Sequence, residues 1–228
     1  MKGASAHMCG RYTILQDKQT IIDRFQIGTD IANFEMSYNV APGQNVLAVI
    51  HDGTKRRAGY LKWGLVPSWS KDKKIGSKMI NARSETAHQK PSFKQLMARK
   101  RCIVIADSFY EWQRTDMERI PKRIQVDGTH LFSFAALWDK WEDENGPLFT
   151  CTLLTKEANE SIRSVHHRMP IILSEEAEDV WLKDSFRNAA EAKQFLDEVD
   201  DVHFHYYTVS DVVNNVKHNE KACIEPIS

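Results

Sequence analysis

Four side chains combine a reactive or titratable group with apolar or constrained neighbours: Cys9, Asn81, Glu111 and His166. Cys9 directly follows Met8 in the stretch MCGRY. If Met8 is the biological start, its removal exposes a cysteine that carries a free α-amine beside its thiol. A terminal amine has a pKa of about 7.7–8.0, below that of a lysine, so a useful fraction is neutral and nucleophilic at neutral pH. If the preceding residues belong to the protein, Cys9 is only an early cysteine on a strand.

The first eight residues, MKGASAHM, are predicted to be an expression leader that precedes a domain over residues 9–228. The stretch MKGASAH lacks the apolar core of a secretory signal, and His-Met is a common cloning junction. The leader is therefore not expected to belong to the folded domain.

Glu111 stands between Tyr110 and Trp112 in a strand-like stretch, DSFYEWQ. A carboxylate in such surroundings is expected to be partly buried, which raises a carboxyl pKa and suits proton transfer. The alternative is a glutamate on the wet face of an antiparallel strand, because successive side chains point to opposite faces. The pattern alone favours that alternative.

His166 lies at the junction between a predicted helix and a predicted strand, where active-site groups are often held on loops. A lone histidine is more often a surface or hydrogen-bonded structural residue. Asn81 and Arg83 alternate, so in an extended segment they face the same side and could orient a polar ligand and hold a phosphate. The alternative is a turn-capping asparagine and a solvated arginine.

The net charge is zero, but the charge is unevenly distributed. Fourteen Lys and Arg residues lie between Lys55 and Arg101, opposed by only Asp72 and Glu85. Such a run usually means a solvated face, but here it also contains aromatic residues. Trp69, in a basic loop, suits a stacking platform for an unpaired base, whereas Trp63 at a strand end is expected in the core.

The composition, 42% hydrophobic and 27% charged, is that of a soluble globular protein without a membrane-spanning run. The four cysteines show no metal-ligand spacing and are expected to be reduced thiols, with Cys102 and Cys151 in the core. No metal or other cofactor is implied. We expect a cytoplasmic, monomeric protein.

Strand patterns dominate, and helices are inserted between them instead of alternating with them. We therefore predict an α+β fold: a single domain with a mostly antiparallel sheet or barrel core and peripheral helices. The Asp-Gly pair at 52–53 predicts a hairpin between strands 46–51 and 56–63. Further strands are expected within 101–155, at 171–173 and at 203–210, and helices at 17–25, 91–97, 156–165, after Ser174 and at 188–199.

Seven motifs in chain order resemble the SOS-response-associated peptidase (SRAP) family and span essentially the whole chain from Met8 onward. They are MCGRY (8–12), YNVAPG (38–43), WGLVPSW (63–69), INARSET (80–86), ADSFYEW (106–112), VHHRMPIIL (165–173) and VSDVVNNVKHN (209–219). The resemblance implies that the partner is single-stranded DNA, in which the protein senses abasic sites and forms a covalent crosslink through Cys9. It further implies association with the nucleoid when the protein is bound to DNA. The amine would condense with the sugar aldehyde to an imine, and the thiol would close a thiazolidine ring.

The resemblance also assigns roles by motif. Glu111 would shuttle protons, His166 would position or protonate the sugar oxygen, and Asn81 would hold Cys9 and the sugar. The residues implied to bind DNA are Arg11, Asn39, Pro42, Trp69, Arg83 and Arg168. A weak abasic-site lyase activity and self-removal of the initiator methionine are further implied.

Two residues depart from the family pattern: Ser108 stands where glycine is common, and Ser70 where a second aromatic residue often follows Trp69. The leader is a third departure, because an acylated Cys9 nitrogen cannot form an imine. Two other functions remain open. One is a cysteine peptidase or hydrolase that uses Cys9 with His166 and Glu111 or Asn81, and the other is a non-enzymatic single-strand-binding module.

Overall fold

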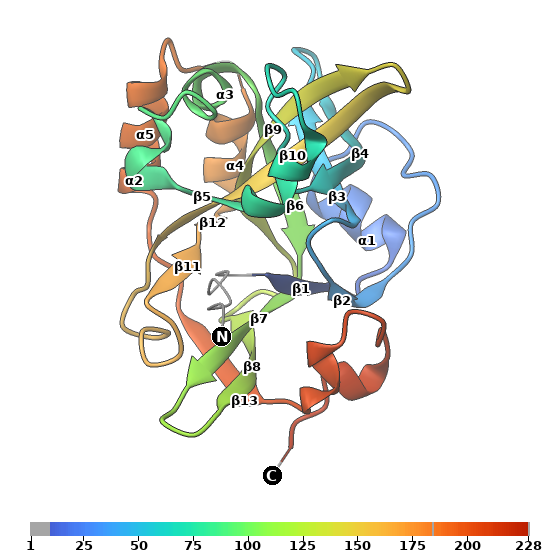
Figure 1. Cartoon of the computed structure of the whole chain (residues 1–228), viewed down its shortest axis with the longest axis vertical. Coiled ribbons are helices and arrows are strands. Elements are labelled where there is room, and N and C mark those ends of the chain that lie inside the picture. Colours follow the sequence, from blue (N-terminus) through green and yellow to red (C-terminus); the bar gives the residue numbers. More distant parts are fainter. Residues whose placement is uncertain (1–9, 184, 228) are drawn as a thin grey trace.

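The computed structural model describes residues 10–183 and 185–227, which form thirteen strands and short helices (Figure 1). The strands are β1 (Arg11–Ile14), β2 (Ser37–Val40), β3 (Asn45–His51), β4 (Arg56–Trp63), β5 (Asn81–Arg83), β6 (Arg101–Ala106), β7 (Ser108–Arg114), β8 (Arg119–Val126), β9 (Phe132–Asp143), β10 (Gly146–Glu157), β11 (Arg168–Pro170), β12 (Ile172–Leu173) and β13 (Phe204–Thr208). The α-helices are α1 (Lys18–Arg24), α2 (Ser84–Ala87), α3 (Lys94–Arg99), α4 (Glu175–Leu182) and α5 (Ala189–Glu198). Three 3₁₀ turns are η1 (Lys73–Lys78), η2 (Asp211–Asn214) and η3 (Lys221–Cys223).

Five strands close into a barrel in the order β10, β4, β3, β6, β9 and back to β10. The closing contact is a parallel pairing between β4 and β10, where Lys62 lies opposite Thr150 and Trp63 opposite Cys151. Except for this pairing and that of β5 with β10, the named strands pair antiparallel. The predicted α+β class with a mostly antiparallel sheet or barrel is confirmed.

A second sheet, ordered β13-β8-β7-β1-β2, lies below the barrel in Figure 1. Its inner face packs on the barrel through aromatic rings: Tyr12 and Phe109 both contact Phe134, with centroid distances of 5.8 and 6.1 Å. Edge-to-face ring pairs of this kind add to the stabilisation from apolar burial. The two sheets thus share one core.

Turn and capping residues define several of the short elements at the positions that the sequence predicted. The hairpin β3–β4 turns at Gly53, whose positive φ of 96° favours glycine. Asp17, Ser174 and Asn188 cap α1, α4 and α5 by accepting backbone N–H hydrogen bonds. Cys102 and Cys151 are fully buried, as expected.

The helix predicted at 156–165 is wrong. Lys156 and Glu157 continue β10 and pair with Met169 and Arg168 of β11, and a series of turns follows. The ladder satisfies the backbone of these residues, so tertiary pairing overrides their helix propensity.

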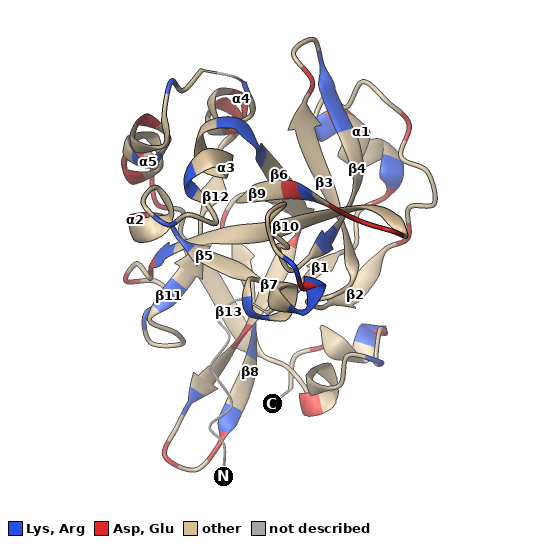
Figure 2. Ribbon diagram, turned by 45° about the horizontal axis from the view of Figure 1, so that its top comes forward, with Lys and Arg blue, Asp and Glu red and all other residues tan. Residues whose placement is uncertain are grey.

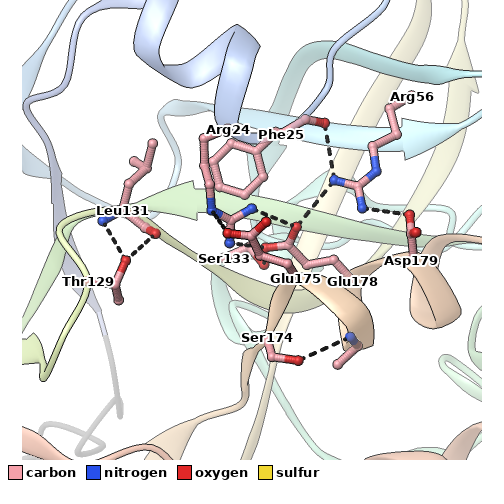
Figure 3. Close-up of polar contacts among 11 residues, drawn as sticks. Arg24, Phe25, Arg56, Thr129, Leu131, Ser133, Ser174, Glu175, Glu178 and Asp179 are labelled. Carbon is pink, nitrogen blue, oxygen red and sulfur yellow. Dashed lines mark hydrogen bonds and ion pairs between the residues drawn. The ribbon is translucent and has the colours of Figure 1, made fainter.

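A buried charge network ties α4 to the barrel (Figure 3). The carboxylate of Glu178 is fully buried and accepts hydrogen bonds from Arg24, Arg56 and Ser133 at 2.8–3.2 Å. Asp179 accepts from the other side of Arg56 at 2.8 Å. A buried carboxylate is stable only when it is paired in this way.

In the described part of the chain, no helix is long and apolar enough to cross a membrane.

Candidate functional site on the inner face of β7

Glu111 is buried on the face of β7 that points toward the barrel. Its side chain is only 2% exposed, and it shares this face with Phe109 and Gln113, since alternate residues of a strand point the same way. Phe109 packs on Phe134 of the barrel. The wet-face alternative is therefore excluded, and the carboxylate is held where water is scarce.

Gln113 connects this face to the loop that carries His166. Its side-chain amide donates a hydrogen bond to the carbonyl oxygen of Ser164 at 3.1 Å. Ser164 precedes His166 by two residues, and Gln113 follows Glu111 by two on the same face. The contact thus places the histidine loop against the strand of the buried carboxylate, although the sequence pattern gave Gln113 no role.

The imidazole of His166 lies against the backbone of Arg168. Its Nδ1 is 3.1 Å from the backbone nitrogen of Arg168 and 3.2 Å from the carbonyl oxygen of the same residue, so it accepts from the N–H in one tautomer and donates to the carbonyl oxygen in the other. Burial lowers the pKa of His166, and the neighbouring His167 and Arg114 lower it further. The ring stacks on His167 with a centroid distance of 4.4 Å. In the neutral imidazole, Nε2 donates a hydrogen bond to a ligand oxygen in one tautomer and accepts one in the other.

Asn81 opens β5 and lies alongside β10, opposite Leu153. It is half-buried, the next residue Ala82 is buried, and Arg83 is exposed. The expected alternation along this segment is confirmed. The core residue Trp63 fixes the backbone just before it, because the indole N–H donates to the carbonyl oxygen of Ile80 at 2.9 Å.

Cys9 lies outside the described residues. The chain after it enters β1, which runs antiparallel to β7 with Arg11 opposite Tyr110 and Tyr12 opposite Phe109. From Arg11, two residues after Cys9, the chain is therefore paired with the strand that carries the buried carboxylate.

Two predicted DNA-binding residues, Arg11 and Asn39, hold the C-terminal segment 209–227, which we call the strap. The Asn39 amide donates to the carbonyl oxygens of Val213, Asn215 and His218 at 3.2, 3.1 and 2.8 Å. Its oxygen accepts from Arg11 at 2.8 Å, and Asn39 is 1% exposed. Asn39 therefore has a structural position inside the fold, whatever its part in binding.

The strap also anchors the outer face of β7 and β1. The Trp112 indole donates to the Asn214 side chain at 2.6 Å, and the Tyr110 hydroxyl donates to the carbonyl oxygen of Cys223 at 3.2 Å. The Arg11 guanidinium donates to the carbonyl oxygens of Val213 and Asn214. The motif VSDVVNNVKHN thus supports the two strands that flank the site, a role that its sequence did not reveal.

Arg168 is buried and paired with a carboxylate. It is one of the three arginines, with Arg11 and Arg83, that are expected to bind DNA. Its guanidinium makes a two-point contact with Glu85 of α2, and it also donates to the Thr155 carbonyl oxygen at 2.8 Å. Arg83 is exposed. Of the three arginines, only Arg83 presents its side chain largely to solvent in the described structure.

The remaining two predicted contact residues line separate cavities. Pro42 lines a cavity of about 400 Å³ that also reaches Ile80, the residue before Asn81. Trp69 is 61% exposed and borders a cavity of about 470 Å³ between its loop and α3. Trp69 is therefore accessible for stacking, and Trp63, 1% exposed, is in the core as expected.

Not all of the basic segment 55–101 faces solvent, and its Lys and Arg positions are spread over several elements in Figure 2. Arg56 and Arg101 point into the fold and are 8% and 6% exposed. Lys100 pairs with the buried Asp139 at 2.7 Å. Part of the charge excess read from the sequence thus stabilises the interior, and the rest is carried by exposed residues such as Lys62, Lys74 and Arg83.

Known proteins share both the sequence motifs and the fold of this chain. The family model described as SOS response associated peptidase (SRAP) matches residues 8–216. Abasic site processing protein YoqW of Bacillus subtilis (strain 168) is 45% identical over 222 residues, which are 96% of this chain and 99% of that protein. Abasic site processing protein HMCES of Gallus gallus is 34% identical over 227 residues. The match covers 85% of this chain and 67% of the Gallus gallus protein.

Solved structures share the fold. A crystal structure of a protein from Bacteroides thetaiotaomicron superposes with a TM-score of 0.85 at 24% identity, covering 96% of this chain and all of that one. A match of the family model over nearly the whole length, with relatives above 30% identity, defines membership. The chain belongs to the SOS response associated peptidase (SRAP) family.

Proposed function

We propose that this protein captures abasic sites in single-stranded DNA by forming a covalent thiazolidine crosslink through Cys9, after residues 1–8 have been removed. The observation that carries the proposal is the buried carboxylate of Glu111 on β7, with the His166 loop bound to the same face through Gln113. The names of the relatives, abasic site processing proteins, supply the class of substrate.

The chemistry needs both nucleophilic atoms of an N-terminal cysteine. The neutral α-amine adds to C1′ of the ring-opened sugar, and loss of one water gives an imine. The Cys9 thiol then adds across the C=N bond, its sulfur bonding to carbon and its proton passing to nitrogen. The five-membered ring resists hydrolysis far better than the imine.

The described residues fit the proton transfers that these steps require. Glu111, in its buried position, takes the proton that the attacking amine releases and returns it to the departing water. His166, neutral and in the tautomer that carries its proton on Nε2, donates a hydrogen bond to the sugar oxygen as the ring opens. Asn81 holds the amine and the sugar from β5.

The DNA strand is proposed to follow the exposed basic and aromatic groups. Arg83 contacts a backbone phosphate, and Trp69 stacks on an unpaired base. Pro42 walls the pocket. Arg11, Asn39 and Arg168 act near the lesion from the positions in which the strap and Glu85 hold them.

The name of the family also includes a peptidase activity. We propose that this activity is self-cleavage of the Met8–Cys9 peptide bond, which frees the amine. β-Elimination from the imine would give a weak abasic-site lyase side reaction. The protein acts as a monomer on DNA in the cytoplasm.

Gel-shift crosslinking with a chain that starts at Cys9 separates this function from its rivals. Cys9→Ala should abolish the heat-stable adduct with abasic single-stranded DNA, and Glu111→Gln should slow its formation by 10²–10⁴-fold, about the range for lost acid–base catalysis. A cysteine hydrolase would instead tolerate the leader and cleave peptide or amide substrates. A pure binding module would bind intact and abasic strands equally, with Glu111 and His166 dispensable.

A further inference from the structure

Lys122 of β8 lies directly opposite Glu111 of β7, and no step of the proposed chemistry uses it. Residues that face each other in an antiparallel pair point to the same side of the sheet, with Cβ atoms about 4.5–5.5 Å apart. On the other side of β8, Thr208 of β13 lies opposite the same lysine. Glu111, Lys122 and Thr208 thus form one row across the inner face of the sheet.

The ammonium group of Lys122 is held within this row. Its Nζ donates a hydrogen bond to the side-chain oxygen of Thr208 at 2.7 Å, and the lysine is half-buried. Charges in partly buried positions are screened by water and salt much less than exposed charges. Lys122 therefore brings a weakly screened positive charge to the row that contains the buried carboxylate of Glu111.

The loop that carries His166 covers this lysine. The carbonyl oxygen of Ser164 accepts a hydrogen bond from Gln113 of β7 at 3.1 Å, and its hydroxyl lies 3.0 Å from that of Tyr206 of β13. β8 runs between these two strands. Gln113 pairs with the residue two positions before Lys122, and Tyr206 with the residue two positions after it. The two contacts of Ser164 therefore span β8 diagonally over Lys122, which places the lysine inside the candidate site.

A positive charge in this row favours the ionised form of Glu111. Burial acts in the opposite direction, because it disfavours a charged carboxylate and raises the carboxyl pKa. A cation within about 4–6 Å favours the carboxylate and lowers that pKa. Since a protonated carboxyl cannot take up a proton, the proposed base needs the second effect to offset the first.

We propose that Lys122 is a positioning residue of the site, whose ammonium keeps Glu111 ionised so that the carboxylate accepts the proton of the attacking amine. The inference rests on the proposed function, since it takes Glu111 as the proton acceptor. No motif or aromatic pattern in the sequence marks Lys122, because its relation to Glu111 arises from the pairing of β7 with β8.

Other elements also contribute titratable groups to this face or to the loop that covers it. The loop contributes His166, and β13 contributes the Tyr206 phenol. In the described part of β1, Tyr12 is the titratable residue on the face of Glu111. The charged or titratable neighbours of His166 are Arg114, His167 and Arg168. All of these groups, and the terminal amine, are shared by the parent protein and a Lys122 variant, so the ratio of their rates isolates the effect of the lysine.

The test is the rate of crosslink formation between a chain that starts at Cys9 and abasic single-stranded DNA, at saturating DNA, from pH 5 to pH 8. Lys122→Met should slow the reaction on the order of tenfold near pH 5 and by less than about twofold near pH 8, since one unit of pKa is a factor of ten in the ionised fraction below both values. Without the ammonium, the carboxyl pKa of Glu111 rises. At pH 5 the variant therefore keeps a proton on Glu111 that the parent protein has released, whereas at pH 8 both carboxyl groups are ionised.

Two further variants separate the charge of Lys122 from its hydrogen bond. Lys122→Arg keeps the charge and should restore the parent profile, whereas Lys122→Gln keeps a donor for Thr208 without the charge and should behave like Lys122→Met. Lys140→Met, at an exposed ion-paired position of β9, is the matched control and should follow the parent protein at every pH. An equal loss at every pH, a parent-like profile of Lys122→Met, or an arginine variant as slow as the methionine variant would overturn the proposal.

A titration without DNA distinguishes failure of this inference from failure of the proposed function. The carboxyl ¹³C signal of Glu111, identified by its loss in Glu111→Gln, is followed with pH by NMR. Its midpoint should be higher in Lys122→Met than in the parent protein by about one pH unit or more. If the midpoint shifts but the parent protein forms no crosslink, the inference stands and the proposed chemistry fails. If crosslinking occurs but the midpoint is unchanged, the inference fails alone.

Discussion

The side-chain amide of Gln113 donates a hydrogen bond to the carbonyl oxygen of Ser164 at 3.1 Å, joining the strand of Glu111 to the loop of His166. Glu111 and Gln113 lie on one face of β7, and Ser164 and His166 lie in one loop. This contact therefore ties the loop that carries the imidazole to the strand that carries the buried carboxylate.

Gln113→Ala should slow crosslink formation with abasic single-stranded DNA by about tenfold, because the His166 loop loses its attachment to β7. The effect should be on the rate at saturating DNA, while the affinity stays near that of the parent protein. Gln194→Ala on the outer surface of α5 is the control. An unchanged rate in the Gln113 variant would show that this contact does not position the site.

Glu178→Ala should destabilise the fold by about 3 kcal/mol or more, since it leaves the buried charges of Arg24 and Arg56 without their shared partner. Urea unfolding measures the loss. Glu176→Ala, on the exposed side of the same helix, should change the free energy of unfolding by less than about 0.5 kcal/mol. Similar losses for both variants would contradict the role of the network in Figure 3.

Asn39→Ala should cost roughly 1–3 kcal/mol of stability, because carbonyl oxygens of the strap lose a buried donor. It should also lower crosslinking, since Arg11 loses its hydrogen bond to the Asn39 side-chain oxygen. Asn45→Ala, at the exposed start of β3, serves as the control in the same denaturation assay. A variant as stable as the parent protein would show that the strap is held by other contacts.

Acidification should destabilise the parent protein more than His166→Gln. Burial lowers the pKa of His166 in the folded state below its ordinary value of 6.5. As the pH falls through that value, the unfolded chain therefore binds the proton first and the folded state loses stability. The loss begins near pH 6.5 and is complete below the lowered pKa. The comparison is of free energies of unfolding at neutral and mildly acidic pH; an equal loss in both proteins would contradict the assignment.

The fold was predictable where the signals were local. The Asp-Gly turn of β3–β4 and the helices expected from 17, after Ser174 and from 188 all form, and their starts are capped within a few residues by Asp17, Ser174 and Asn188. Closure of the barrel was not predictable, because the pairing of Thr150 with Lys62 joins segments far apart in the chain and leaves no local pattern.

The site was predictable in part for the same reason. Aromatic neighbours marked Glu111, but only the packing of Phe109 on the barrel decides which face of β7 it occupies. Asn39 and Arg11 stood in recognisable motifs, yet their contacts with the strap depend on residues 174 to 203 positions away. Such partners follow from tertiary structure and not from spacing.

The mass of the intact product tests the central claim most directly. A chain that begins at Cys9 is incubated with single-stranded DNA bearing one natural abasic site, and the denatured mixture is weighed by mass spectrometry. The account predicts a species equal to protein plus DNA less one water, which is absent when residues 1–8 remain attached or when Cys9 is alanine. A stable adduct of the same mass with the amine still blocked would contradict it.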